Sequence, residues 1–467
     1  MTTAAPAPTF PVSAPPRPSA AATADEAWRS DTTYVVGHQR PDTDAIGSAL
    51  GYAWFLRASG SELEPVVAAR AGQPGPQALF VLRRFGLSAP RLLNAVWPTF
   101  GHVARKIPPA APDTPVLEAM ARLAGGQERV VAVADVDGTF LGAITPLALA
   151  RAFSQAGGGG DPIAPWRECQ HLLEPLPTFR ERDRVSDHRA ALVRSPGDDF
   201  VVLDGAGKYV GLATRQGVLS PPRARLVLVD HNELDQAVAG AGEAEIVAVL
   251  DHHRLGNPPT VAPIPFVVEP VGSTCTLVGE QCRSLSLPPP PGLAGVLLSG
   301  ILSDTLVFRS PTTTERDRAV GKWLAALADV ENVAGYGDEL LRASPGLGAR
   351  DAREILDADR KLYQMSEAAV SAAQIEVTGL QELPERRDDL LAAMADLRQR
   401  ENLALLCLMV TDVVAGRSRL LCQGEERLLA ALPFARLSDH EWELGDIVSR
   451  KKQLVPALLS VLDEAGF

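Results

Sequence analysis

Residues Tyr34–Leu50 read YVVGHQRPDTDAIGSAL. A short apolar run is followed by His38, Asp42 and Asp44, and then by a helix-like pattern over Ala45–Arg57. An apolar run, a loop and a helix together begin an α/β unit. One imidazole and two carboxylates close together are ligand types that a divalent cation prefers, so we expect a metal site after the first strand.

Composition places the chain among soluble globular proteins. Its 467 residues are 46% apolar and 22% charged, ordinary values for a protein of about three domains. With 45 basic and 57 acidic residues the net charge is −12. This balance argues against nucleic acid and membrane surfaces as partners.

Cysteine use and the first residues bear on location. Five cysteines without a CxxC motif argue against a disulfide framework and favour a reduced, cytoplasmic setting. The Ala/Pro-rich residues 1–30 lack the basic and apolar segments of a signal peptide, so we expect a disordered tail. No run reaches the roughly 18 apolar residues of a membrane span.

Short β-branched runs separated by helical patterns occur on both sides of a different central region. "ELEPVVAAR", "RLVLVD" and "EIVAVLDHH" are predicted to be strands of a parallel sheet, and "GLAGVLLSGILSD" a helix. The Gly/Pro-rich "RASPGLGARD" is typical of a linker. The predicted fold class is therefore α/β. We divide the chain into a tail (1–30), a sheet domain in two parts (31–97 and 222–341), an insertion (98–221), a linker (342–350) and a second α/β domain (351–467).

The central region contains an internal repeat of about 60 residues. Each copy runs from a Pro-rich entry through a helix, a strand and an Asp-Gly-type turn to a strand that ends in Gly-x-x-Thr. The two strand ends read "GAITPLA" and "GLATRQG". We expect the pair to form one module inserted into the surrounding α/β domain.

Four apolar runs end in Asp or His. They are Val36–His38 with Asp42 and Asp44, Leu226–Val229 with Asp230, Ile246–Leu250 with Asp251, His252 and His253, and Leu297–Ser303 with Asp304. Any one of them could be a helix cap or a turn. Because ligands of open parallel sheets bind at the carboxyl ends of strands, the four together indicate one site. Carboxylates and imidazoles without a thiolate suit two Mn, Mg or Co ions, which favours hydrolysis of a phosphoryl ester or anhydride.

These motifs resemble those of a known family. "GHQRPDTDAIGSA", "VDHNE", "LDHHR", "EPVGSTCT" and "SDTLVFRSPTTT" resemble, in order, the motifs of family II inorganic pyrophosphatases in the DHH phosphoesterase superfamily. "SRKKQLVP" (Ser449–Pro456) resembles the signature of their second domain, DHHA2. The resemblance covers residues 31–97 and 222–467. It implies hydrolysis of pyrophosphate to two phosphates by a metal-bridging water or hydroxide, without a covalent intermediate.

The resemblance also implies a ligand set for two divalent cations, with Mn preferred, Co as an alternative, and Mg arriving with the substrate. One ion is expected on His38, Asp42, Asp230 and Asp304, and the other on Asp44, Asp230, His252 and Asp304. Asp230 and Asp304 would bridge the two ions. His253 should face the substrate, and Asp251 should support His252 from behind.

Cations for the substrate are expected on the second domain. Arg450 and Lys451 match the family's substrate-binding pair, and Lys361, in "DADRKLYQM", is the candidate for its other lysine. Taken alone, such a basic stretch is more often a solvated patch. Facing a metal centre in an acidic chain, it suits a highly charged anion, and closure of the two domains would bring it over the site.

The inserted pair resembles a tandem of CBS domains. That implies AMP, ADP or ATP in the cleft between the repeats, and a homodimer. Candidates for the nucleotide site are Arg105, Lys106, Thr145, His188, Thr214 and Arg215. In the family that the pair resembles, the strand end reads Gly-x-x-Thr-x-x-Asp. Here the last position is Ala148 in the first copy and Gly217 in the second. The carboxylate for the ribose is therefore missing, and the alternative is a dimerisation and scaffold module.

Other functions remain as alternatives. An exopolyphosphatase-like DHH/DHHA2 hydrolase would act on longer phosphate chains, although "SRKKQ" favours pyrophosphate. A DHH nuclease or nucleotide phosphatase would carry a Gly-rich motif in its second domain, and the sequence has none. A non-catalytic nucleotide sensor would have an incomplete metal site, whereas every expected ligand is present.

Overall fold

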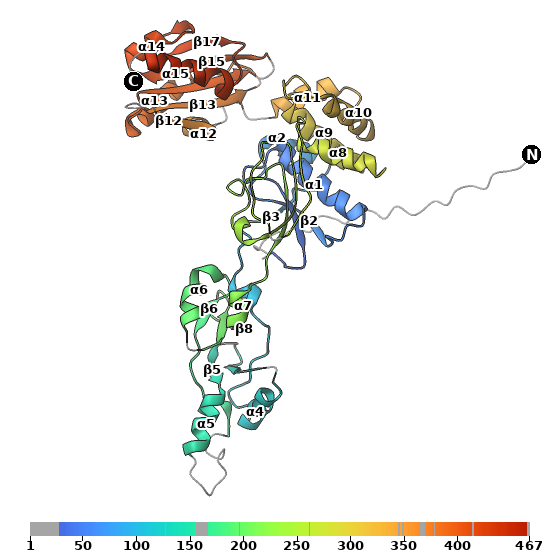
Figure 1. Ribbon diagram of the computed structural model, residues 1–467, viewed down its shortest axis with the longest axis vertical. Coiled ribbons are helices and arrows are strands. Elements are labelled where there is room, and N and C mark those ends of the chain that lie inside the picture. Colours follow the sequence, from blue (N-terminus) through green and yellow to red (C-terminus); the bar gives the residue numbers. More distant parts are fainter. Residues whose placement is uncertain are drawn as a thin grey trace, which may run out of the picture.

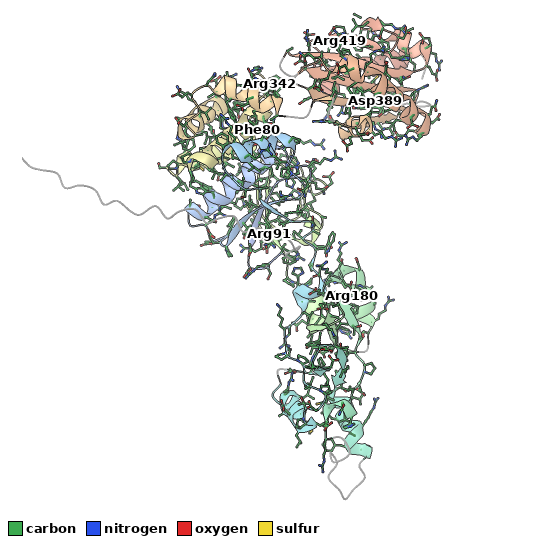
Figure 2. All side chains as sticks on the ribbon, turned by 180° about the vertical axis from the view of Figure 1, so that it is seen from behind. Phe80, Arg91, Arg180, Arg342, Asp389 and Arg419 are labelled. Carbon is green, nitrogen blue, oxygen red and sulfur yellow. The ribbon has the colours of Figure 1, made fainter. Side chains whose placement is uncertain are left out.

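The computed structural model describes residues 28–464 except 127, 156–166, 196, 261, 344–345, 348–349, 365–368, 378 and 413–414. Nearly all of the predicted tail 1–30 and part of the predicted linker 342–350 lie outside the described residues. Figure 1 shows a first domain built from the blue and yellow segments, a middle region in cyan and green, and a C-terminal domain in orange and red. Figure 2 shows the same parts from behind, marked by Arg91, by Arg180, and by Asp389 with Arg419.

The first domain is built on a sheet of six parallel strands in the order β11-β10-β9-β1-β2-β3. The strands are β1 (Thr33–Val36), β2 (Val66–Arg70), β3 (Arg91–Leu92), β9 (Arg225–Val229), β10 (Glu245–Asp251) and β11 (Phe266–Val268). Strand β1 pairs with both β2 and β9, although the whole middle region separates β3 from β9 in the sequence. The predicted parallel sheet is confirmed.

Helices pack on this sheet and form the largest buried apolar cluster with it. They are α1 (Thr43–Ala58), α2 (Pro76–Arg84), α8 (Thr274–Ser284), α9 (Pro291–Asp304), α10 (Glu315–Leu327) and α11 (Val333–Arg342). A 3₁₀ turn at Ala241–Glu243 packs in a separate apolar cluster. Helix α1 begins two residues before the predicted Ala45, because the Asp42 carboxylate accepts the Ala45 N–H at 2.9 Å and caps it. A Cβ on Gly300 of α9 would lie 2.9 Å from the Asp44 carboxylate, so α1 and α9 can touch closely there.

The helix predicted from "GLAGVLLSGILSD" is confirmed. Leu297–Ser303 lies inside helix α9, and Asp304 is the last residue of that helix. Residues Leu293–Leu302 of this helix are all buried. Burial on every side is typical of a helix that is apolar all round.

The backbone after α9 makes an unusual turn. Leu306, Val307 and Phe308 all have positive φ, between 50° and 61°. Side chains with a Cβ rarely adopt this conformation in succession, so the surrounding packing must hold it. A Cβ on Gly321 of α10 would lie 2.7 Å from Phe308, and one on Gly337 of α11 would lie 2.6 Å from Val307. These two glycines make room for the turn that follows Asp304.

The middle region consists of two similar units. Its elements are α3 (Phe100–Val103), α4 (Val116–Ala124), β4 (Val131–Ala134), β5 (Phe140–Ile144), α5 (Pro146–Gln155), a 3₁₀ turn (Cys169–His171), β6 (Thr178–Arg180), α6 (Val185–Arg194), β7 (Asp199–Leu203), β8 (Tyr209–Thr214) and α7 (Arg215–Leu219). The hairpins β4–β5 and β7–β8 correspond. In each hairpin turn one aspartate, Asp135 or Asp204, accepts two backbone N–H groups through Oδ1. The repeat read from the sequence is therefore present in the backbone and in its turns.

The C-terminal domain contains a mixed sheet in the order β12-β13-β14-β15-β17-β16, in which only β13 and β14 run parallel. Its elements are α12 (Ala352–Ala358), β12 (Arg360–Gln364), β13 (Ala369–Val377), α13 (Leu383–Arg400), β14 (Leu405–Asp412), β15 (Arg417–Gly424), α14 (Glu426–Ala431), β16 (Ala435–Ser438), β17 (Glu441–Gly445), a π-helical turn (Arg450–Leu454) and α15 (Val455–Glu464). One face of the sheet packs on α12 and α13, and the other packs on α14, the π turn and α15.

All five cysteines are buried and free. This agrees with the sequence, which argued against a disulfide framework. Among the helices that the structure describes, none is long and apolar enough to cross a membrane.

Candidate metal centre

Three neighbouring strands bring most of the predicted ligands to one edge of the first sheet. Strands β1, β9 and β10 are adjacent, and His38, Asp230 and His252 follow their carboxyl ends. Helix α1 adds Asp44 from its first turn, and α9 adds Asp304 from its last. Residues far apart in the sequence therefore meet, as expected for residues at the carboxyl ends of parallel strands.

The first group of potential ligands is His38, Asp42 and Asp230, whose ligand atoms lie within 4.8 Å of one another. His38 Nε2 is 3.6 Å from Asp42 Oδ2 and 3.4 Å from Asp230 Oδ2. Burial opposes protonation of this imidazole, but its interactions with the carboxylates of Asp230 and Asp42 outweigh burial and raise the pKa of His38 to about 10.

The second group is Asp44, Asp230, His252 and Asp304. His252 Nε2 is 3.4 Å from Asp230 Oδ1, 3.6 Å from Asp304 Oδ2 and 3.9 Å from Asp44 Oδ2. Burial opposes protonation here too, but the interaction with Asp230 and the charge of Asp44 raise the pKa of His252 to about 9. This group contains all four ligands predicted for the second ion.

Asp230 belongs to both groups and offers one oxygen to each. Oδ2 faces His38 and Oδ1 faces His252. Its φ is +62°, a strained value that aspartate tolerates better than most residues. The predicted bridging position of Asp230 fits this geometry. Among the described residues, Asp304 joins the second group but not the first.

The charges and unpaired atoms of the centre fit divalent cations. Burial, and then the charge of Asp230, raises the pKa of Asp44 to about 7. Burial, and then the charges of Asp44 and Asp42, raises the pKa of Asp304 well above its ordinary value. Asp230 Oδ2 and His252 Nε2 are buried without a hydrogen-bond partner in the described structure. Such a cluster of carboxylates and imidazoles is costly without positive charge, and two divalent cations would relieve that cost.

Helix α8 holds one ligand through a contact that the sequence analysis missed. The Asp44 carboxylate accepts a hydrogen bond from the Ser273 hydroxyl at 2.7 Å. It also accepts hydrogen bonds from the N–H groups of Thr274 and Cys275, at 2.7 and 2.9 Å. Thr274 Oγ1 also donates to Asp230 Oδ1 at 3.2 Å. The "GSTCT" segment was visible as part of a motif, but only the fold brings it to Asp44.

Asp251 supports a different ring from the one predicted. Its Oδ1 accepts the backbone N–H of His252 at 2.8 Å, but its ring partner is His253 Nδ1, at 2.9 Å. The ring of His252 is instead oriented by Val271 O, 3.1 Å from its Nδ1. On the other side, Asn232 Nδ2 donates to Asp251 Oδ2 at 2.5 Å. Asn232, Asp251 and His253 therefore form one chain, and Asn232 was not predicted.

The basic candidates of the C-terminal domain differ in exposure. Arg450 is buried, with 8% of its surface exposed, whereas Lys451 and Lys361 are exposed. Glu376, at the end of β13, contributes to the raised pKa of Asp304, after burial and the carboxylates of the centre itself. The carboxyl end of β13 therefore lies within electrostatic reach of the metal centre.

The two threonines predicted for a nucleotide site are engaged elsewhere. Thr145 Oγ1 donates to the carboxylate of Glu174. Thr214 Oγ1 accepts the Gly217 N–H at 3.2 Å and caps helix α7. In both copies the hydroxyl of the Gly-x-x-Thr strand end has a partner within the module.

The cationic candidates of the middle region differ in their surroundings. Arg215 pairs with Asp198 at 2.7 Å and donates to three backbone carbonyls. His188 packs against aromatic rings, 5.1 Å from Phe179. Arg105 and Lys106 are exposed.

The fold and the site together define a class, the two-domain metal-dependent hydrolases of the DHH type. Residues 32–301 match the DHH family, N-terminal domain, and residues 338–461 match the DHHA2 domain. The chain belongs, within that class, to the family of manganese-dependent inorganic pyrophosphatases, known as family II. It is 37% identical over 240 residues to the "probable manganese-dependent inorganic pyrophosphatase" of Enterococcus faecalis, covering 51% of this chain and 78% of that protein. A relative from Streptococcus pyogenes is 38% identical over 236 residues, covering 50% of this chain and 75% of the relative.

A solved structure shows the same fold over most of the chain. The "putative family II inorganic pyrophosphatase" of Methanococcus jannaschii matches with a TM-score of 0.52 and 24% identity, covering 92% of this chain and 99% of that one. CBSX2 in complex with AMP matches with a TM-score of 0.23 and 20% identity, covering 26% of this chain and 92% of that one. The repeat within the middle region, rather than this last likeness, is our basis for describing that region as CBS-like.

Proposed function

We propose that the protein hydrolyses inorganic pyrophosphate to two phosphates with two divalent cations, manganese preferred. The observation that carries the proposal is the pair of His/Asp groups that share Asp230. Two adjacent cations are the arrangement that clamps the attacking and leaving oxygens in phosphoryl transfer. Family membership supports pyrophosphate as the substrate.

The residues of the centre divide into two ligand sets. His38, Asp42 and Asp230 would hold one ion, and Asp44, Asp230, His252 and Asp304 would hold the other. When bound, the ions would supply an activated water and neutralise charge on the phosphoryl oxygens. Asp304 as a second bridging ligand, and Mg arriving with the substrate, are parts of the proposal that rest on the family resemblance.

The remaining site residues would act on the substrate directly. His253, oriented by Asp251, can donate a proton or hydrogen bond to a phosphate oxygen. Arg450, Lys451 and Lys361 would bind the anion from the C-terminal domain. Lys361 and Tyr363 point to the same side of β12, and Tyr363 packs on the sheet face that the π turn covers.

The test is phosphate release from pyrophosphate with Mn, Co or Mg, compared with tripolyphosphate and longer chains. We expect metal-dependent release from pyrophosphate that falls as the chain lengthens. Faster release from long chains would identify an exopolyphosphatase-like enzyme. No release with any metal would reject the proposal and favour the alternative of a non-catalytic nucleotide sensor.

For the middle region we propose a scaffold and dimerisation role rather than control by AMP, ADP or ATP. Thr145, Thr214 and Arg215 are engaged within the module, and both copies lack the ribose carboxylate. Saturating AMP, ADP or ATP should leave the hydrolysis rate unchanged. Sedimentation should find a dimer that becomes a monomer when residues 98–221 are replaced by a short linker. A nucleotide effect on the rate would overturn this part.

A further inference from the structure

Arg450 is held inside its own domain by one neighbouring residue. Its side chain is only 9% exposed, and its NH1 group lies 3.0 Å from Asp359 Oδ2. The same NH1 group also donates to the backbone carbonyl of Asp359. Asp359 therefore meets the guanidinium twice, once through its side chain and once through its main chain.

This contact is built into the fold and is not an incidental surface pair. The Asp359 carbonyl also accepts the Gln374 N–H at 3.2 Å, which ties it to strand β13. Gln374 Oε1 accepts the Arg450 N–H at 3.2 Å, and Gln374 Nε2 donates to Val448 O at 3.1 Å. One glutamine thus fixes both Asp359 and the segment that carries Arg450.

The guanidinium is nevertheless incompletely satisfied. Arg450 Nε is buried without a hydrogen-bond partner in the described part of the chain. A buried donor without a partner costs free energy, and a guanidinium has five donors in a planar fork. Asp359 is the partner that water reaches, because 54% of its side chain is exposed.

We propose that Asp359 sets the affinity of the substrate site by competing with the substrate for Arg450. A carboxylate and a phosphoryl group offer a guanidinium the same kind of oxygen, so the two compete for it. In the protein without substrate the Asp359 carboxylate occupies Arg450, and binding of pyrophosphate exchanges that carboxylate for a phosphoryl oxygen. The released carboxylate is rehydrated, and the Nε group gains an acceptor. This inference rests on the proposed role of Arg450 in binding pyrophosphate.

The competing role and a supporting role predict opposite signs. If Asp359 competes, removing its charge tightens binding, because no pair has to be broken first. If Asp359 only orients Arg450 for the substrate, removing its charge weakens binding. The substitution Asp359→Asn keeps the backbone carbonyl contact and the shape of the side chain, and removes only the charge.

The control is Asp357→Asn. Asp357 is 63% exposed and pairs with Arg360 at 3.4 Å rather than with Arg450. It carries the same charge two residues away, so it reports the general effect of one negative charge fewer on an anionic ligand. The double variant Asp359→Asn with Arg450→Ala tests whether the effect passes through Arg450.

The experiment measures the Kd of imidodiphosphate, a non-hydrolysed analogue, by calorimetry with Mn, and the KM for pyrophosphate. We expect Asp359→Asn to lower both about threefold to fivefold, the upper range for a half-exposed ion pair. Asp357→Asn should change neither comparably, and the tightening should vanish in the Arg450→Ala background.

An unchanged or higher Kd in Asp359→Asn would overturn the inference, as would an equal tightening in Asp357→Asn or one that persists without Arg450. If the wild-type protein neither binds imidodiphosphate nor releases phosphate from pyrophosphate, the proposed function itself fails, and this inference fails with it. If wild type does both and Asp359→Asn is not tighter, only the inference about Asp359 fails.

Discussion

The metal centre and the basic cluster of the C-terminal domain are organised in opposite ways. In the metal centre, Ser273 and Thr274 hold the Asp44 carboxylate, and Asp230 Oδ2 and His252 Nε2 are buried without a hydrogen-bond partner in the described structure. In the basic cluster, Arg450 is already paired within its own domain. The centre is thus ready to bind cations, whereas the basic cluster must exchange partners to bind an anion.

The largest effect should come from the residue that both metal groups share. Asp230→Asn removes one negative charge from each group, so we expect hydrolysis to fall at least about 10³-fold. Manganese titration should show that binding of both ions is lost or strongly weakened. Asp235→Asn, at an exposed position nearby in the sequence, should keep wild-type values. Full manganese binding in Asp230→Asn would show that the two groups do not share this ligand. Asp304→Ala should also abolish turnover.

In the C-terminal domain, Arg450→Ala should lower kcat/KM for pyrophosphate roughly 10²-fold, as expected for loss of one strong donor to the reacting anion. Manganese stoichiometry should not change, because Arg450 belongs to the other domain. Arg427→Ala, an exposed arginine of α14, is the matched control. Loss of manganese in Arg450→Ala would contradict the division of labour between the two domains.

A smaller effect is expected from Asn232, which reaches the substrate only through Asp251 and His253. Asn232→Ala should lower kcat about tenfold, in the range for residues that orient an active-site ligand. The pH profile of kcat should shift, because the charge of Asp251 is then less well compensated and the pKa of His253 changes. An unchanged pH profile with a lower rate would point to a structural role alone.

The smallest and most graded effect is that of pH on manganese binding. The raised pKa values of His38, about 10, and His252, about 9, mean that both rings are protonated at pH 7 without metal. A metal needs the neutral ring, so binding must release protons. Manganese affinity should therefore rise with pH across the range 6 to 9. Calorimetry in buffers of different ionisation enthalpy should find net proton release at pH 7, and net uptake would contradict these charges.

Much of the centre could be predicted because it depends on local patterns. Each ligand follows a recognisable apolar run, and the carboxyl ends of parallel strands meet by geometry. An aspartate after an apolar run can be both a helix cap and a potential metal ligand. Asp42 is an example, because it caps helix α1 and also belongs to the first ligand group.

The remaining features depend on contacts that no local pattern encodes. Whether Asp251 supports His252 or His253 depends on ring orientation, which Val271 O decides from the following loop. The hydrogen bond from Ser273 to Asp44 joins residues that are 229 positions apart in the sequence. The pairing of Asp359 with Arg450 spans 91 residues, and an exposed aspartate in a basic motif gives no local sign of it.

The two-ion centre around Asp230 can be tested by a manganese titration of the wild-type protein, with pyrophosphate hydrolysis followed on the same sample. If the two ligand groups each hold one ion, the protein binds two manganese ions per chain, and phosphate release reaches its maximum only when the second is bound. One ion per chain at full activity, or two ions without hydrolysis of pyrophosphate, would contradict it.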